Sequence, residues 1–293
     1  MALNLVRSAV SALSYHAVTL FLFTKSDIKT TLIPISILSA VSAPSCSLSS
    51  TAHAVFWIWL HLLQFDVSNQ TLDPEEDKNN KKDRPLPSGR ITFRNAIIFR
   101  WALVPICFAL SLCYSAQVFY ASVALVFFTI LYDECHCHAG HWAVRNFVNA
   151  CGFASFEYGS TLIARCDRTS LDGAGIISVV CSFGIFLTTI QAQDFKDTEG
   201  DRLIGRQTLP LVVPSIARYT VISGLLCWSI GLSFLWQLDI MTSLCFHALA
   251  LLVGVRFLKY KTIPQDQVSF YLYNVWLSAA HALPGYWRSY VAV

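Results

Sequence analysis

The sequence carries little charge for its length. Only 13% of its 293 residues are Asp, Glu, Lys or Arg, whereas 55% are hydrophobic. Because soluble domains carry about 25% charged residues, this composition excludes an ordinary soluble protein and predicts a chain that crosses a membrane several times. No polar segment is long enough to bury a core of its own. We therefore expect one transmembrane domain over residues 1–293, in which residues 1–29 form a cytosolic or interfacial N-terminal segment.

Several other features are scarce, and their scarcity excludes further classes of protein. The net charge is only +3 and no basic stripe occurs, which excludes nucleic acid as a partner. The ten cysteines lack the paired spacing of a disulfide scaffold, so we expect most of them to be buried small hydrophobic residues. No glycine-rich phosphate loop or Ser-His-Asp arrangement stands out. A cleavage site is also lacking, so residues 9–24 are expected to form a retained helix that is interfacial or partly buried.

Long hydrophobic runs make up most of what remains. A helix needs about 20 mostly apolar residues to span a bilayer. By this criterion the expected spans are residues 30–47, 50–68, 92–113, 116–132, 142–164, 173–193, 211–235, 240–258 and 266–284. The first is the weakest, because Pro34 and Pro44 interrupt it. The expected fold class is all-α, a polytopic membrane protein with nine transmembrane helices in the lipid bilayer.

Two short acidic clusters stand out against this background. The first is Asn69-x3-Asp73-x3-Asp77 and the second is Asp194-x2-Asp197-x3-Asp201, each at the end of a predicted span. This spacing places each cluster on one helical face, where like charges repel unless a cation lies between them. Mg²⁺ is commonly held by a few carboxylates together with substrate phosphates. We therefore predict that Mg²⁺ is held against a diphosphate by Asn69, Asp73, Asp77, Asp194, Asp197 and Asp201, of which Asp73, Asp77, Asp197 and Asp201 are the candidate catalytic residues.

The alternative interpretation is two solvated loops with ordinary acidic residues. Pro74 also complicates the first cluster, because it disfavours helical torsions at Asp73. We expect the helix to unwind there, which is tolerated at membrane depth where the backbone lines a polar cavity. An unwound helix weakens the prediction that Asp77 continues the same face.

Topology places the two clusters together. Four predicted helices separate them, and an even number returns the chain to the same membrane surface. Basic residues concentrate on that surface: Lys25, Lys29, Lys78, Lys81, Lys82, Arg84, Arg90, Lys196, Arg202, Arg206, Lys259 and Lys261. By the positive-inside rule this face is cytosolic and the carboxyl terminus lies on the far side. The endoplasmic reticulum is the expected membrane.

Basic residues near the clusters are candidates for binding the diphosphate. Arg84 and Arg206 each follow a cluster and can grip phosphate oxygens bidentately, which lysine does less well. Lys196 and Lys25 are the other candidates. Arg90 and Arg202 are at least as well explained as markers of the cytosolic face.

Two other features have competing interpretations. The run Cys135-His136-Cys137-His138, with His141, is too tightly spaced for a usual zinc site, and its position favours part of a lid over the active face. Glu157 lies inside a predicted span, where a carboxylate is costly. It either faces the cavity or makes a structural hydrogen bond.

These motifs resemble the UbiA superfamily of intramembrane prenyltransferases. The resemblance rests on Asn69-x3-Asp73-x3-Asp77, the run Arg84-Pro85-Leu86-Pro87-Ser88-Gly89, and Asp197-x3-Asp201-x3-Gly205-Arg206. It implies a helical bundle around a central cavity open to lipid, with Mg²⁺ and an isoprenyl diphosphate bound between the aspartate clusters. Many members have Asn-Asp at the start of the first motif, where this chain has Asn69-Gln70. That removes one carboxylate, for which Asp194 is a candidate replacement.

Two reactions share the same first step, ionisation of the allylic diphosphate. The cation is trapped either by an aromatic or quinone-type acceptor, as in a prenyltransferase, or by the chain's own double bonds, as in a terpene cyclase. Asn69-Gln70, His141-Trp142-x2-Arg145-Asn146 and Phe156-Glu157-x-Gly159 resemble the fungal branch of membrane cyclases. The favoured prediction is therefore cyclisation of farnesyl diphosphate to a sesquiterpene. A transporter or lipid-binding protein is a remote alternative. Transporters usually place such charges near the bilayer midplane, whereas the acidic clusters of this chain lie at the ends of predicted helices.

Overall fold

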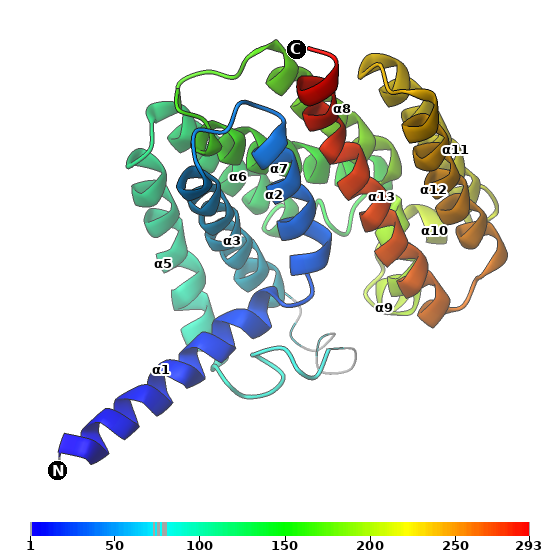
Figure 1. Cartoon of the computed structure of the whole chain (residues 1–293). Coiled ribbons are helices and arrows are strands. Elements are labelled where there is room, and N and C mark those ends of the chain that lie inside the picture. Colours follow the sequence, from blue (N-terminus) through cyan, green and yellow to red (C-terminus); the bar gives the residue numbers. More distant parts are fainter. Residues whose placement is uncertain (1, 73, 75–76, 78–80, 293) are drawn as a thin grey trace.

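The computed structural model describes residues 2–72, 74, 77 and 81–292, and helices make up most of them (Figure 1). The N-terminal helix is α1 (Ala2–Thr24). The helices of the bundle are α2 (Ile33–Val41, after a π-helical turn Ile28–Leu32), α3 (Leu48–Gln70), α5 (Phe93–Leu112), α6 (Ala116–Asp133), α7 (Trp142–Ala164), α8 (Gly173–Thr189), α11 (Pro214–Leu235), α12 (Ile240–Lys259) and α13 (Ile263–Tyr290). Between α8 and α11 lie a 3-10 helix (Ile190–Asp197), α9 (Thr198–Leu203) and α10 (Leu209–Val212).

The bundle closes on itself. From α5 to α8, and again from α11 to α13, each helix packs against the next along the chain, and α8 packs against α11. The α3 helix packs against α2, α5, α6 and α7, and the last helix, α13, packs against α2. This ring of contacts encloses an interior between α3, α6, α7 and α13.

Helices occupy all nine ranges in which spans were expected, but they differ in character. Within the described residues, five helical stretches are long and apolar enough to cross a membrane: α5, α6, Gly173–Leu203 beginning with α8, α11 and α12. The helices α3, α7 and α13 carry buried polar residues such as Asp66, Glu157 and Asn274, which lowers their hydropathy. The all-α membrane fold is confirmed, and nine spans stay a prediction.

The close approach of α3 and α7 depends on one glycine. A Cβ placed on Gly159 would lie 2.6 Å from the ring of Trp57, so no larger residue fits there without movement. Trp57 is fully buried and its Nε1 donates a hydrogen bond to Ser111 Oγ at 2.8 Å. The contact locks α3, α5 and α7 together beside the interior.

The two ends of the bundle carry different features (Figure 1). The loop after α3 and the α9 segment lie at the same end, near the point where α1 joins the bundle. At the opposite end lie the α2–α3 loop, the α7–α8 loop and the C-terminus. We call these the cluster end and the far end.

A disulfide between Cys46 and Cys166 joins the two loops of the far end. The cysteine spacing does not predict this pair, because the two residues are 120 positions apart. Of the remaining cysteines only Cys107 is buried, whereas Cys113, Cys135, Cys227 and Cys245 are exposed. The expectation that most cysteines are buried is therefore wrong.

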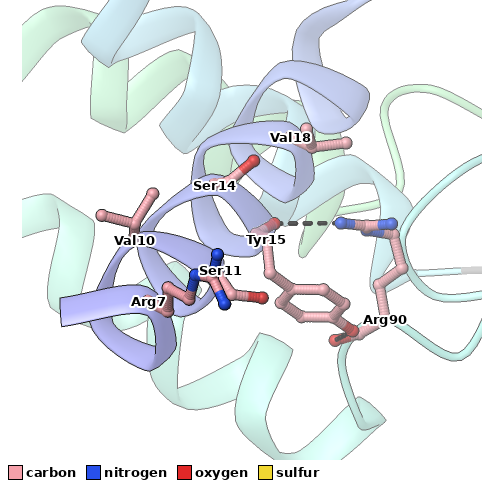
Figure 2. A pocket seen from close by; sticks show the side chains of 7 residues that line it. All are labelled: Arg7, Val10, Ser11, Ser14, Tyr15, Val18 and Arg90. Atoms are coloured by element: carbon pink, nitrogen blue, oxygen red, sulfur yellow. Dashed lines mark hydrogen bonds between the residues drawn. The ribbon is translucent and has the colours of Figure 1, made fainter. Parts of the chain in front are cut away.

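The α1 helix leads away from the bundle and is tied to it by Arg90 (Figure 2). The Arg90 guanidinium donates to Tyr15 O at 2.9 Å and to Thr19 Oγ1 at 3.0 Å, and it lies 4.3 Å from the centre of the Tyr15 ring. The shallow hollow beside these contacts is lined by Arg7, Val10, Ser11, Ser14, Tyr15, Val18 and Arg90, and no carboxylate is among them. Arg90 therefore anchors α1.

Candidate active site

A cavity of about 920 Å³ lies inside the bundle and reaches the cluster end. Its walls come from the segment between α1 and α2 and from α3, α6, α7, α13 and the 3-10 helix. Five of the predicted site residues line it: Lys25, Asn69, Arg84, Lys196 and Asp197. Its mouth is polar and charged, and its interior is mostly apolar and aromatic.

The first cluster lies where α3 ends. The helix stops at Gln70 and a turn follows at Thr71, whereas the unwinding expected at Asp73 falls outside the described residues. Asn69 and Asp77 therefore belong to different helical segments, and Asp73 lies outside the described residues. Asp77 is buried, and both of its carboxylate oxygens accept hydrogen bonds from Arg84 Nη1 at 2.8 Å.

The second cluster lies where α8 gives way to the 3-10 helix and then to α9. Asp194 is buried and accepts a hydrogen bond from Arg145 Nη1 of α7 at 2.8 Å. Asp197 lines the cavity and pairs with its neighbour Lys196. Asp201 is buried behind them, and its Oδ1 accepts from Arg206 Nη1 at 3.0 Å.

Each cluster is followed by a turn that contains a glycine in the left-handed region. Gly205 has φ +75°, and the turn brings Arg206 N to within 2.9 Å of Asp201 O. Gly89 has φ +71° and closes the loop in which Arg90 N donates to Pro85 O at 3.0 Å. Side chains other than glycine rarely adopt this conformation. Gly205 thus fixes a turn beside Arg206, the partner of Asp201, whereas Gly89 fixes the turn beside Arg90, which anchors α1.

The clusters face each other across the cavity mouth. Lys81 lies between them, where burial lowers the pKa of its ammonium group and the nearby charges of Arg84 and Lys196 lower it further. Asp197 opposes this effect. Because Arg84 follows the first cluster and Lys196 and Asp197 belong to the second, one lysine senses both. Charges of both clusters therefore act on the same lysine at the cavity mouth.

The side chains at the cavity mouth are of a type that suits Mg²⁺, but the distances between those that the structure describes do not form a complete metal site. Among the described residues, no group of three Asp, Glu, His or Cys side chains is arranged to hold a metal ion. However, the Oδ2 atoms of Asp66 and Asp201 are buried without a hydrogen-bond donor from that part of the chain. Carboxylate and amide oxygens are ligands that Mg²⁺ accepts. The carboxylate and amide side chains of both clusters are therefore of the type that would hold Mg²⁺.

Polar residues around the first cluster hold it in place. Asp133, at the end of α6, accepts hydrogen bonds from Ser68 and from Asn69 Nδ2, the latter at 3.5 Å. Arg100 donates to Thr71 Oγ1 at 3.2 Å, directly after α3. These contacts fix the last turn of α3 against α5 and α6.

The sequence analysis did not identify Asp27, Asp66 or Arg145 as site residues, although all three line the cavity. Asp66 and Arg145 lie inside predicted spans, where charged side chains are rare and usually functional. That was the signal available for both. Asp27 lies in a polar segment, and nothing in its neighbours distinguishes it.

Aromatic rings line the interior below the mouth. The rings of Phe153 and Phe186 stack with their centres 3.8 Å apart, and Phe156 lies on the same wall. Tyr273 lines the cavity from α13, with its hydroxyl 2.8 Å from Thr189 Oγ1. The faces of such rings attract cations, by about 0.5–2 kcal/mol each.

Glu157 makes a structural hydrogen bond, which was one of the two interpretations of this residue. It is fully buried, and its Oε1 accepts from Ser182 Oγ at 2.5 Å. His281 Nε2 lies 2.9 Å from the same hydroxyl, and its Nδ1 lies 3.0 Å from Pro34 O. The network joins α7, α8, α13 and α2. Glu157 is not among the described residues that line the cavity.

The loop with Cys135-His136-Cys137-His138 has the geometry of a turn. His138 Nδ1 lies 2.8 Å from Tyr132 O, and His136 has φ +55°. Tyr132 lines the cavity but the four residues of the run do not, among the described lining residues. A zinc site is not formed by the part of the chain described here.

Comparisons with known proteins agree with this architecture. The profile of the UbiA prenyltransferase family matches residues 31–277. The chain is 34% identical to fumagillin beta-trans-bergamotene synthase of Aspergillus fumigatus over 269 residues, which is 91% of each chain. It is 29% identical to a diterpene cyclase of Hericium erinaceus, over 87% of this chain and 83% of the relative.

Solved structures show the same fold. A UbiA homologue from Archaeoglobus fulgidus bound to GPP and Mg²⁺ superposes with a TM-score of 0.65, covering 90% of this chain and 98% of that one at 14% identity. A digeranylgeranylglyceryl phosphate synthase gives 0.64, covering 93% and 99% at 20% identity. This integral membrane protein is an enzyme of the UbiA prenyltransferase family, in the class of terpene cyclases and closely related prenyltransferases.

Proposed function

We propose that the protein ionises an isoprenyl diphosphate with the help of Mg²⁺ and cyclises farnesyl diphosphate to a sesquiterpene, releasing diphosphate. The observation that carries this proposal is one cavity of about 920 Å³ with a charged mouth and an aromatic interior. A diphosphate fits the first part and an isoprenyl chain fits the second. The similarity to a bergamotene synthase and a diterpene cyclase supports cyclisation.

The mouth residues would divide the work on the diphosphate. Mg²⁺ would be held by Asn69, Asp73, Asp77, Asp197 and Asp201, and when bound it supplies neutralisation of the leaving group. Arg84, Lys196, Lys25 and Arg206 would bind phosphate oxygens. Asp194 has another role in this proposal, because its buried pair with Arg145 holds the arginine at the cavity wall.

The interior residues would control the carbocation. As the allylic carbon–oxygen bond breaks, its electron pair leaves with the diphosphate and the positive charge stays on the hydrocarbon. The rings of Phe153, Phe156 and Phe186 lie where they can stabilise that charge. The surrounding apolar wall excludes water, so a double bond of the chain captures the cation and a proton is finally lost.

Transfer to an aromatic or quinone-type acceptor is the second candidate function. The observation in its favour is Asn149, which lines the cavity and whose Nδ2 is buried without an acceptor among the described residues. A polar acceptor molecule would satisfy it. The chain is also 25% identical to a polyprenyl transferase of Hericium erinaceus over 270 residues.

One assay separates the two. Membranes containing the protein are incubated with farnesyl diphosphate and Mg²⁺ but no acceptor, and the products are measured by mass spectrometry. A cyclic hydrocarbon or alcohol is expected. Product that forms only after an aromatic acceptor is added would overturn cyclisation and establish the transferase.

We further propose that the protein lies in the endoplasmic reticulum membrane with the cluster end in the cytosol. The disulfide Cys46–Cys166 at the far end supports this orientation, because disulfides persist in oxidising compartments such as the lumen. The free thiol of Cys135 is exposed near the cluster end. In sealed microsomes an impermeant maleimide should label a variant that retains only Cys135 as a free thiol. Protection of Cys135 until detergent is added would reverse the orientation.

A further inference from the structure

The first cluster lacks a carboxylate that its resemblance to the family leads one to expect. Gln70 occupies that place, and the structure turns it away from the cavity. Its side chain is buried, and its Nε2 donates a hydrogen bond to Phe23 O at 2.9 Å. The suggested replacement, Asp194, is already paired with Arg145 at 2.8 Å. Neither residue supplies the missing charge.

A different carboxylate lies one helical turn earlier on α3. Asp66 precedes Gln70 by about one turn of 3.6 residues, and it lines the cavity. Its exposed fraction is only 3%. Its Oδ2 has no hydrogen-bond donor among the described residues, although an unsatisfied buried carboxylate is costly.

A second carboxylate meets it from a distant part of the chain. Asp27, between α1 and the π-helical turn, also lines the cavity and lies close enough to Asp66 for the two carboxylates to interact. Its own oxygens accept from Ser26 Oγ at 2.8 Å and from Thr30 Oγ1 at 3.2 Å. Two carboxylates in contact cannot both stay charged unless a cation, or a shared proton, lies between them.

Two of the nearby cations already have carboxylate partners, and Lys81 also lies near Asp66. Arg84 bonds both oxygens of Asp77 at 2.8 Å, and Lys25 pairs with Asp83 at 2.7 Å. Asn69, one turn beyond Asp66, also lines the cavity. Its amide nitrogen is directed to Asp133, so its amide oxygen points another way. Oxygen donors from three positions thus border the same part of the mouth.

We propose that Asp27 and Asp66 bind a divalent cation of the Mg²⁺ type and so replace the carboxylate absent at position 70. The site rests on the proposed metal-dependent function of the cavity, and it adds a ligand pair outside both acidic clusters. It also gives the N-terminal segment a function, because Asp27 brings the chain after α1 into the mouth.

Direct cation binding tests this assignment without turnover. Mn²⁺ is titrated into the purified full-length protein, and the free ion is followed by electron paramagnetic resonance. We compare the wild type with Asp27→Asn and Asp66→Asn, and with Asp167→Asn as a control, since Asp167 is an exposed carboxylate at the far end. Each of the first two variants should lower Mn²⁺ affinity by at least about tenfold, and the control should bind as the wild type does.

Unchanged Mn²⁺ binding in both variants would refute the proposed cation site. Asp27 and Asp66 would then have to share a proton. If Asp66→Asn fails to fold, shown by its melting curve, Asp27→Asn in the half-buried loop decides alone. The result is independent of the reaction. A wild type that releases no diphosphate, but whose Mn²⁺ binding depends on Asp27, would refute the proposed function and retain the site.

Discussion

The two acidic clusters reach a similar arrangement by different backbone routes. In the first, α3 stops at Gln70 and the chain re-enters a helical conformation near Asp77. In the second, the helical path continues from α8 through the 3-10 helix into α9. Yet each ends with a buried aspartate held by a following arginine, Asp77 by Arg84 and Asp201 by Arg206.

The backbone differs between the two clusters, but the ion pair between a buried aspartate and a following arginine is common to both. Leaving a buried carboxylate without a partner is costly, so each arginine holds its aspartate in place. In the proposed function, bound diphosphate and Mg²⁺ would offer both groups new partners, phosphate oxygens for the arginine and the cation for the aspartate. The clusters should therefore contribute equally to catalysis.

The largest expected effect comes from removing an aspartate from either cluster. Asp77→Ala and Asp197→Ala should each lower the rate of diphosphate release on the order of 10²–10³-fold, because each removes charge that stabilises the leaving group through Mg²⁺. Release of labelled diphosphate from farnesyl diphosphate measures this rate. Asp167→Ala, at the far end, is the control. Full activity in either cluster variant would break the equivalence of the two clusters.

A smaller effect is expected from the arginines. Arg84→Ala and Arg206→Ala should each lower kcat/KM on the order of tenfold to 100-fold, as expected for a lost charge-assisted contact of about 1.5–3 kcal/mol. Arg202→Ala is the control, because Arg202 lies in α9, four residues before Arg206, and is exposed. If only one of the two arginines matters, the diphosphate is bound by one cluster and the other serves only the metal.

Much of the fold was predictable from the sequence, because hydrophobic runs report burial directly. Each of the nine expected ranges contains a helix. The contact between Asp27 and Asp66 was not predictable, since it depends on how the segment after α1 folds over α3. The same holds for Cys46 and Cys166, which only the finished bundle brings together.

The candidate site was predictable in its residue types and less so in its pairing. The spacing of Asp194, Asp197 and Asp201 suggested one common role. The structure separates Asp194 from the other two, because Arg145 of α7 reaches it from across the interior. A tertiary contact of this kind leaves no local pattern in the sequence. A charged residue such as Arg145, inside an apolar run, does indicate a polar interior.

The cavity interior offers a milder test than its mouth. Phe153→Ala removes one ring of the stacked pair with Phe186 and enlarges the cavity. Loss of about 0.5–2 kcal/mol of cation stabilisation corresponds to a rate about 2- to 30-fold lower, together with a change in product distribution. Phe147→Ala, on the outer face of the same helix, should leave the products unchanged. Identical product profiles from Phe153→Ala and the wild type would remove the ring from the mechanism.

The smallest effect on turnover is expected at Glu157, a buried carboxylate that lies in neither cluster. Its hydrogen bond to Ser182, which His281 extends to Pro34 O, links four helices around the interior without lining the cavity. Glu157→Gln should lower stability by about 1–3 kcal/mol, since it disturbs a buried network, while kcat of the folded fraction stays within about twofold. Thermal unfolding in detergent, measured beside the rate per folded molecule, separates the two quantities. A loss of kcat with an unchanged melting temperature would instead show that Glu157 takes part in the reaction. Because Glu157 lies outside the cavity mouth, it would then have to act on the hydrocarbon and not on the diphosphate.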